Sequence, residues 1–298
     1  MSPSVDEQIL KDKIARLDRQ LCAARVKLAE KASANVSSYS PTPSTHDPSP
    51  PPNVALPNHS LLLLSDSALP LGSFAFSSGL ESYLAHHPTA KGNPSCLDNF
   101  CSFLALILTS LATTTLPYLI VAHKAPENLQ DLDAELDACT LCPVARRASV
   151  AQGKALLTLW ERALKDDVAV SPAVKALGQF SRAIRVPRSR GDEDVELSGH
   201  FAPIWAAATS AMGINLHESA YTFLFNHAKA VVSAAVRASV MGPYKAQGLL
   251  ASAWLRGEIE SAMEANWGRS VEEAGQGVMM LDMWVGRHEL LYSRIFNS

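Results

Sequence analysis

The sequence predicts an all-α protein, namely a helical bundle of about ten helices that follows an N-terminal amphipathic helix and a disordered linker. Two observations favour this fold class. Ala and Leu, which both favour helix, are abundant in a chain whose hydrophobic fraction is 47%. No segment sustains the alternation of apolar and polar residues typical of a half-buried strand, and Pro, Gly and capping residues instead separate long helical patterns. Many helices with short connections form bundles.

Residues 1–33 are expected to form a separate amphipathic helix. Apolar residues from Leu10 to Leu28 recur with alternating spacings of four and three, which is the heptad pattern of a coiled coil. Lys and Arg residues make the segment basic, and the pattern fits self-association or docking as well as a solvated amphipathic helix. Residues 34–58 are rich in Ser and Pro, which predicts a disordered linker. The folded domain is then expected over residues 59–298.

The domain opens with an apolar run that ends at Ser65 and a tight connection that contains Pro70 and Gly72. Ser78 and Glu81 have the Ser-x-x-Glu spacing of a capping box, which predicts the start of a helix there.

An uncharged run, Phe103–Ala122, follows and is long enough to span a bilayer. It contains five Ser or Thr residues and is interrupted by Pro117, so we interpret it as part of two buried core helices over residues 98–115 and 117–138. We therefore expect no membrane-spanning segment.

Start and stop signals place the remaining helices. Pro143 begins one helix, and Ser171-Pro172 supplies an N-cap followed by Pro at the first helical position of another. A charged loop is expected over residues 188–199. The later helices are predicted from His200 to Gly213, from Asn215 to Met241, from Tyr244 to about Gly257, and weakly over residues 276–292.

Composition argues against several classes of function. A net charge of −3 gives no basic face for nucleic acid. Five scattered cysteines in 298 residues favour a reducing compartment over a disulfide scaffold, and charged residues occupy the N-terminus where a secretory signal would need an apolar core. We therefore expect a cytoplasmic protein.

Motifs for catalysis or metal binding are weak. Gly153-Lys154 lacks the upstream Gly of a phosphate-binding loop, and Cys139-x-x-Cys142 has no second pair of zinc ligands. The histidines do not cluster like a metal site, although transient metal contact by one or two of them fits the sequence. A Ser/His/Asp arrangement remains open, but no Gly-x-Ser-x-Gly elbow is present. An enzyme is therefore not predicted.

Five separate segments instead carry a family resemblance. They are LLLLSDSALPLGSFAFSSGLE over residues 61–81, Arg146-Arg147-Ala148-Ser149 with Gly153 to Leu157, Gly199-His200-Phe201-Ala202-Pro203, Ser233-Ala234-Ala235-Val236-Arg237 with Gly242, Gln247 and Gly248, and the tail Tyr292–Ser298. In this order they resemble the signatures of the UreF family of urease accessory proteins, over roughly residues 60–298. Gly242-Pro243-Tyr244 departs from the family's Gly-Gln pattern at that point.

The resemblance implies an all-helical, homodimeric scaffold with no catalytic site and no tightly bound cofactor. Its implied partners are the accessory protein UreD, also called UreH, the nickel-carrying GTPase UreG, and apo-urease. The complex would promote GTP-dependent nickel insertion, with nickel passing through the complex rather than remaining in this subunit.

Aromatic and Arg side chains are typical anchors of protein interfaces, and they suggest where partners bind. We expect the C-terminal tail to become ordered on binding UreD and Arg237 to lie at the dimer or GTPase face. Alternatively, the two Phe residues belong to the core, Arg237 is an exposed helix residue, and the tail is frayed. The candidate partner-binding residues are Phe74, Phe76, Arg237, Arg294, Phe296 and Ser298.

One alternative function is open on this sequence. A generic helical adaptor unrelated to nickel could assemble through the N-terminal helix, and its function would then be lost without residues 1–33.

Overall fold

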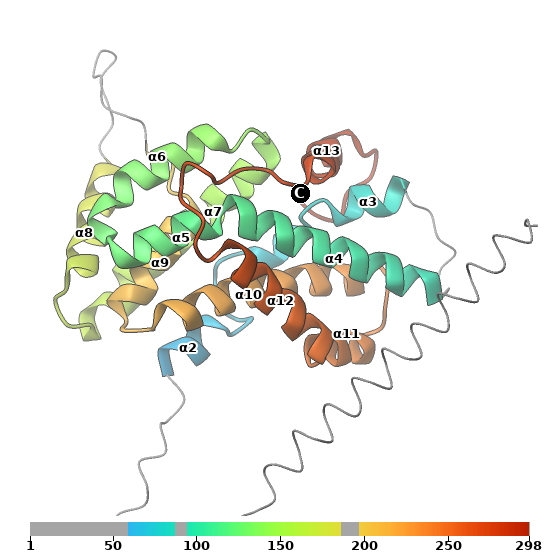
Figure 1. Cartoon of the computed structure of the whole chain (residues 1–298), viewed down its shortest axis with the longest axis horizontal. Coiled ribbons are helices and arrows are strands. Elements are labelled where there is room, and N and C mark those ends of the chain that lie inside the picture. Colours follow the sequence, from blue (N-terminus) through green and yellow to red (C-terminus); the bar gives the residue numbers. More distant parts are fainter. Residues whose placement is uncertain (1–58, 87–93, 186–196, 298) are drawn as a thin grey trace, which may run out of the picture. The chain divides into compact units, whose positions relative to one another are not determined.

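The computed structural model describes residues 59–86, 94–185 and 197–297, which all lie in the compact unit Leu56–Ser298. These residues form twelve α-helices and no strand, so the predicted all-α bundle is confirmed for them (Figure 1). The helix expected over residues 1–33, the linker over 34–58 and most of the loop 188–199 lie outside the described residues. The helices are α2 (His59–Leu64), α3 (Leu80–His86), α4 (Pro94–Thr114), α5 (Leu116–Lys124), α6 (Leu129–Cys139), α7 (Pro143–Leu159), α8 (Pro172–Ala183), α9 (Phe201–Ala211), α10 (Leu216–Arg237), α11 (Pro243–Leu250), α12 (Ala253–Asn266) and α13 (Met279–Arg287).

Helix α9 lies at the centre of the bundle. Nine of its eleven residues are buried, and most of them are Ala, which lets α5, α7 and α8 approach closely. Trp205 is its large anchor, and the indole N–H donates to the carbonyl oxygen of Ser219 at 3.2 Å. A helix that is apolar on nearly all sides is expected only at such a position.

The uncharged run Phe103–Ala122 packs into this core as predicted. By length and composition alone, Leu97–Thr114 in α4 could cross a membrane, and 39% of that window is buried. Helix α4 contacts α5, α10 and α12, and Pro117 lies in the first turn of α5, where its missing N–H costs no hydrogen bond. The buried residues of the run include Phe103, Leu104, Ile107, Leu108, Ala112, Leu116, Leu119, Ile120 and Ala122.

Two predicted N-caps are confirmed by hydrogen bonds. The Ser171 hydroxyl accepts from the N–H of Val174 at 3.3 Å, and the Asn215 side chain accepts from the N–H of Glu218 at 2.8 Å. Each bond satisfies one of the unpaired N–H groups that every helix leaves at its N-terminus.

Three predicted boundaries are wrong. The helix expected over residues 117–138 divides at Pro126 into α5 and α6, because proline cannot continue the hydrogen bonds of α5. Helix α10 ends at Arg237 rather than Met241, and Ser239 adopts a left-handed φ of 61° just beyond it. The helix expected from Tyr244 to about Gly257 divides because Ser252 caps α12, accepting from the N–H of Leu255 at 3.2 Å.

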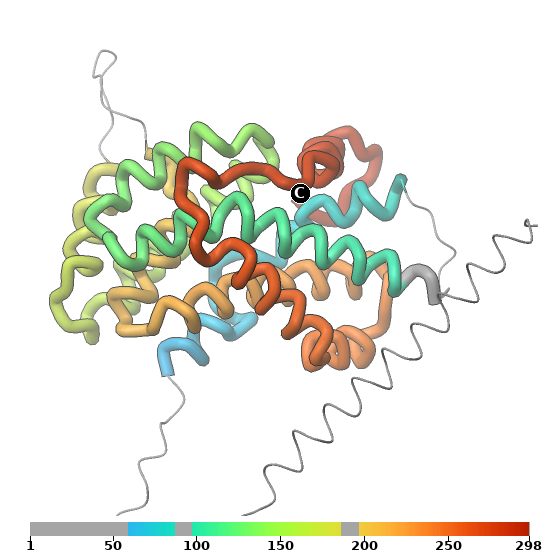
Figure 2. Tube along the Cα trace, in the orientation of Figure 1, coloured from blue at the N-terminus to red at the C-terminus, as the bar shows by residue number. Residues whose placement is uncertain are grey.

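The C-terminal segment crosses the bundle before it ends. Figure 2 shows the chain after α12 running over α4 before it forms α13. The N–H of Gly275 donates to the carbonyl oxygen of Thr113 at 3.2 Å, and the Ser110 hydroxyl donates to Gln276 at 2.8 Å. These bonds hold the crossing segment, and α13 then packs against α3 and α7.

Candidate partner-binding site

Glu81 connects residues 61–81, which we call the signature segment, to the C-terminal tail that begins at Tyr292. Its carboxylate accepts the backbone N–H of Ile295 at 2.8 Å and of Phe296 at 3.3 Å. Ser78, with a left-handed φ of 53°, has its hydroxyl 3.3 Å from Nε2 of His227. The predicted capping box is therefore wrong, although α3 does begin at Leu80. Both side chains make long-range contacts instead of capping the helix.

Further contacts hold the tail against the bundle. The Phe296 side chain is only 5% exposed, and its carbonyl oxygen accepts from Nε2 of the buried His288 at 3.0 Å. The N–H of Asn297 donates to the carbonyl oxygen of Ala75 at 2.8 Å, and Arg147 donates to the carbonyl oxygen of Asn297 at 3.3 Å. The expectation that the tail becomes ordered on binding UreD is thus wrong for residues 295–297, because the chain itself supplies their contacts.

Arg237 brings together two other predicted residues. Its guanidinium lies 4.3 Å from the centroid of the Phe296 ring and donates a hydrogen bond to the carbonyl oxygen of Phe74. Burial lowers the pKa of Arg237 from its ordinary value. Arg237 therefore contacts both the signature segment and the tail. It is not an isolated exposed residue, because it links these two segments.

The remaining predicted residues differ in exposure. The Phe74 side chain is 64% exposed and so is not a core residue, whereas Phe76 is half-buried. Arg294 is exposed, and Ser298 lies outside the described residues. Phe74 and Arg294 are available for contact with another protein, whereas Phe296 faces inward.

Large apolar side chains lie exposed on α13 and the tail. Exposed apolar residues that occur as a group often mark a binding surface, and Met adapts to many partner shapes. None of them is among the partner-binding residues predicted from the sequence, although the Met-Met-x-x-Met spacing on a weakly predicted helix is a usable signal. We call these six residues the C-terminal apolar surface: Met279, Met280, Met283, Leu290, Tyr292 and Ile295.

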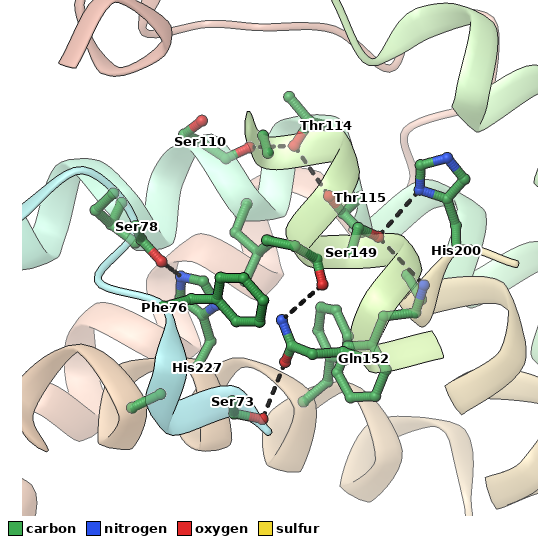
Figure 3. Close-up of a pocket in the computed structure, with 18 of the residues that line it drawn as sticks. Ser73, Phe76, Ser78, Ser110, Thr114, Thr115, Ser149, Gln152, His200 and His227 are labelled. Carbon is green, nitrogen blue, oxygen red and sulfur yellow. Dashed lines mark hydrogen bonds between the residues drawn. The ribbon is translucent and has the colours of Figure 1, made fainter. Parts of the chain in front are cut away.

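A cavity of about 330 Å³ lies behind the signature segment (Figure 3). Polar side chains from different elements pair across its wall. The Ser73 hydroxyl donates to Gln152 at 2.9 Å, and Ser78 contacts His227. Burial lowers the pKa of His227 to about 4, so this imidazole is neutral at pH 7. The cavity wall thus fixes the signature segment onto α7 and α10.

Ser149, His200 and Asp137 form a hydrogen-bonded chain at the edge of this cavity. Nδ1 of His200 lies 3.0 Å from the Ser149 hydroxyl, and Nε2 lies 2.9 Å from Asp137. Burial by itself would raise the pKa of Asp137, but hydrogen bonds from Arg146 and His200 outweigh it and the pKa lies below its usual value. Ser149 sits inside α7 and its hydroxyl also accepts from the N–H of Phe201 at 3.2 Å. The chain of bonds therefore ties α6, α7 and the start of α9 together.

The packing at the start of α9 accounts for two of the sequence motifs, Gly199-His200 and Gly153-Lys154. The buried Asp133 carboxylate accepts from the N–H groups of Ser198, Gly199 and His200 at 2.6–3.0 Å, which satisfies free donors before the helix. Gly199 has a φ of +85°, and a Cβ on Gly153 would lie 2.1 Å from its carbonyl oxygen. Gly153 is therefore required for close packing of α7 on this turn rather than for phosphate binding.

Comparison with known proteins agrees with these motifs. A sequence model of the UreF family matches residues 98–253. An uncharacterised urease accessory protein UreF-like from Schizosaccharomyces pombe is 35% identical over 240 residues, which cover 80% of this chain and 97% of that protein. Urease accessory protein F of Oryza sativa subsp. indica is 31% identical, covering 78% and 82% respectively. Urease accessory protein UreF of Actinobacillus pleuropneumoniae is 25% identical, covering 80% and 97%.

The chain belongs to the UreF family. The resemblance of five short segments to this family is thus confirmed by similarity that extends across four fifths of the sequence. The family assigns the protein to urease maturation as an accessory protein.

Potential metal ligands are dispersed over the part of this UreF protein that the structure describes. Among the residues that the structure describes, no group of three or more His, Cys, Asp or Glu side chains could hold a metal ion. The His217 ring is tilted by 49° to the Trp267 ring, with the two centroids 5.6 Å apart, and it does not line the cavity that His227 lines. Cys139 is exposed and Cys142 is buried, both as free thiols.

Proposed function

We propose that this UreF protein acts as a scaffold in urease maturation rather than as a catalyst. It binds a UreD-type accessory protein through the C-terminal apolar surface, recruits a UreG-type GTPase, and docks the complex on apo-urease. The complex then promotes GTP-dependent insertion of nickel, which is cargo of the complex and not a resident cofactor of this chain. This activity belongs in the cytoplasm and requires neither nucleic acid nor a membrane.

One observation carries this proposal. The tail exposes apolar side chains to solvent, while hydrogen bonds to Glu81 hold its backbone in place. The N–H groups of Ile295 and Phe296 are bound to Glu81, so the exposed Ile295 and Tyr292 side chains stand on a supported backbone. A surface that is ordered before binding loses less conformational entropy when the partner docks. This supports a binding role for the tail.

The exposure of each predicted residue decides whether we assign it to direct partner contact or to support of the surface. We assign direct partner contact to Arg294 and Phe74, together with Tyr292 and Ile295, because their side chains are exposed. Phe296 is assigned to support of the surface from inside. Arg237 serves the same support, and its expected place at the dimer or GTPase face stays a prediction.

The interface assignment is tested by co-purification with the UreD-type partner. Tyr292→Asp and Ile295→Asp place charge on exposed positions and are expected to abolish co-purification without changing helical content. Val170→Asp is a matched control, because Val170 is 79% exposed and lies outside the surface. Normal co-purification of both surface variants would overturn the assignment.

Deletion of Ser293–Ser298 is a less clean test than these point variants. It would remove the buried Phe296 ring and leave Glu81 and His288 without their partners on the tail. We still expect the deletion to keep the helical fold and to abolish partner binding, but only the point variants separate contact from support.

The maturation role is tested in cells that lack the gene. We expect full-length but inactive, nickel-free urease at normal nickel uptake, and activity restored by this chain. Normal urease activity in such cells would contradict the proposal. Removal of residues 1–33 should have a mild effect, whereas complete loss of function would favour a helical adaptor that assembles through that segment.

A further inference from the structure

The Cys139-x-x-Cys142 motif lies on the turn between α6 and α7 and has no part in the function proposed above. Cys139 is the last residue of α6, and Cys142 is the N-cap of α7. Both are free thiols that line the cavity behind the signature segment, but Cys139 is exposed whereas Cys142 is only 8% exposed. Paired thiols in a reducing compartment are more often redox-active than structural. The motif therefore combines a sulfur that a small oxidant can reach with a second, sheltered sulfur three residues away.

A buried tyrosine gives Cys139 a hydrogen-bond donor. The Tyr118 side chain is 1% exposed, and its hydroxyl makes no hydrogen bond of ordinary geometry with the residues that the structure describes. Burial raises the pKa of Tyr118, and the adjacent Cys139 and the carboxylates of Glu135 and Glu272 raise it further, so the hydroxyl keeps its proton. A buried donor without an acceptor is unfavourable, and the thiolate of the adjacent Cys139 is an acceptor for it. The thiolate is the form of cysteine that reacts with oxidants.

The buried thiol of Cys142 supports helix α13. Cys142 packs with Val144 and Val285 in a small apolar cluster. Val285 is one of two buried residues of α13, and a Cβ on Gly79 would lie 3.0 Å from its side chain, so Val285 also lies against the signature segment. Cys142 therefore contacts the helix that exposes the three Met residues of the C-terminal apolar surface. A change in the position of its sulfur reaches that surface through Val285.

We propose that Cys139 and Cys142 form a reversible disulfide with hydrogen peroxide as the oxidant, and that this disulfide weakens binding of the UreD-type partner. The Cys139 thiolate attacks one peroxide oxygen, the O–O bond breaks, and the second oxygen takes a proton and leaves as water. The Cys142 thiolate then attacks the sulfur of the Cys139 sulfenic acid, so the S–S bond forms, the S–O bond breaks, and the hydroxyl group takes a proton and leaves as a second water. The two thiols thus give two electrons and two protons to one peroxide, which becomes two waters.

The disulfide changes the packing against α13 because its geometry is fixed. The two Cβ atoms of a disulfide lie about 3.5–4.5 Å apart, so the sulfur of Cys142 turns from Val285 toward the exposed Cys139. Helix α13 then loses a contact at one of its two buried residues. The effect on partner binding rests on the scaffold function proposed above, whereas the disulfide itself does not. A dithiol reductant reverses both.

The chemistry is tested by mass spectrometry of the full-length chain after treatment with hydrogen peroxide. Both cysteines fall in one tryptic peptide, residues 125–146, so the disulfide removes two hydrogen atoms from that peptide and blocks its alkylation. We expect this product in the wild type and in Cys101→Ser, the matched control at another free thiol, but not in Cys139→Ser or Cys142→Ser. Two alkylated thiols, or a sulfinic acid at Cys139 in place of the link, would overturn the proposal.

The consequence is tested by hydrogen exchange of α13 and by co-purification with the UreD-type partner. Oxidation should speed amide exchange in residues 279–287 and lower the amount of recovered partner at least about fivefold. Dithiothreitol should restore both, which separates the disulfide from oxidation of the exposed Met residues, because methionine sulfoxide is reduced by dedicated enzymes. Cys139→Ser should show no change that dithiothreitol reverses.

The outcomes separate this proposal from the scaffold function. A disulfide that leaves exchange and partner recovery unchanged overturns the regulatory proposal, as does a loss of the partner that dithiothreitol does not reverse. Failure of the reduced wild type to bind the partner contradicts the scaffold function instead, and the peptide masses and exchange rates still decide whether the disulfide forms and loosens α13. Circular dichroism of each variant shows whether the bundle is folded.

Discussion

Replacement of Glu81 by Ala should release the C-terminal tail while leaving the bundle folded. Glu81 lies at the start of α3, and its side chain is 14% exposed. Its carboxylate accepts two backbone N–H groups of the tail, from Ile295 at 2.8 Å and from Phe296 at 3.3 Å. Ala offers no acceptor, so both donors lose their partner.

The magnitude follows from these two bonds. A hydrogen bond to a charged group contributes about 1.5–3 kcal/mol, and the 3.3 Å bond is longer than the usual range and weaker. The loss should therefore be about 2–3 kcal/mol in the free energy of opening the tail. The buried Phe296 ring and the bond from His288 remain, so opening stays local rather than unfolding the domain.

Hydrogen exchange measures this directly. Amide exchange of Ile295 and Phe296 should become about 30 to 160 times faster in Glu81→Ala, because each 1.4 kcal/mol changes the opening equilibrium tenfold. The matched control is Glu289→Ala, which removes the exposed ion pair with Arg147 and should change these rates about fivefold or less. Unchanged exchange in Glu81→Ala would refute the role of the carboxylate. Weaker co-purification of the UreD-type partner should accompany faster exchange.

Three further predictions concern the stability of the domain. Gly153→Ala should lower the free energy of unfolding, measured in urea, by about 2–4 kcal/mol, because its Cβ would lie 2.1 Å from the backbone of Gly199. Gly178→Ala is the control: open space surrounds Gly178, so this change should raise the free energy of unfolding by about 0.5–1 kcal/mol. Equal effects of the two changes would contradict the packing argument. The pKa of His227 is lowered to about 4 in the folded protein, so the unfolded state binds more protons below pH 6.5. The free energy of unfolding should therefore fall by about 2 kcal/mol between pH 8 and pH 5. Urea titrations of His227→Gln should lack this part of the pH dependence. Ser149→Ala should cost about 1–3 kcal/mol in thermal unfolding, because two buried partners lose their hydrogen bond, and an unchanged melting temperature would argue against the link between α7 and α9.

Local signals in the sequence were sufficient for much of the fold. Ser171 and Asn215 were predicted as N-caps because their side-chain oxygens bond to the backbone of their own helix. Pro126 and Ser252 are equally local signals, but each lies inside a longer apolar pattern that predicts one continuous helix. At these two positions a single residue outweighs the surrounding periodicity.

Ser78 and Glu81 show where local reasoning fails. Their spacing fits a capping box, yet Glu81 bonds to residues more than 200 positions away, and Ser78 contacts His227. A carboxylate accepts from whichever donors the fold brings near, and the sequence alone does not order those alternatives. The same holds for Arg237, whose ring and carbonyl partners come from the two ends of the domain.

By itself, the sequence determined the helical class, the separate character of residues 1–58 in composition, and membership of the UreF family, because composition, helix signals and short motifs are properties of neighbouring residues. Only the tertiary structure decided that the tail is held by the chain's own residues, that Phe296 points inward while Tyr292 and Ile295 point outward, and that Gly153 is needed for packing. These features depend on contacts between segments far apart in sequence, and such contacts are fixed by the packing of the whole domain.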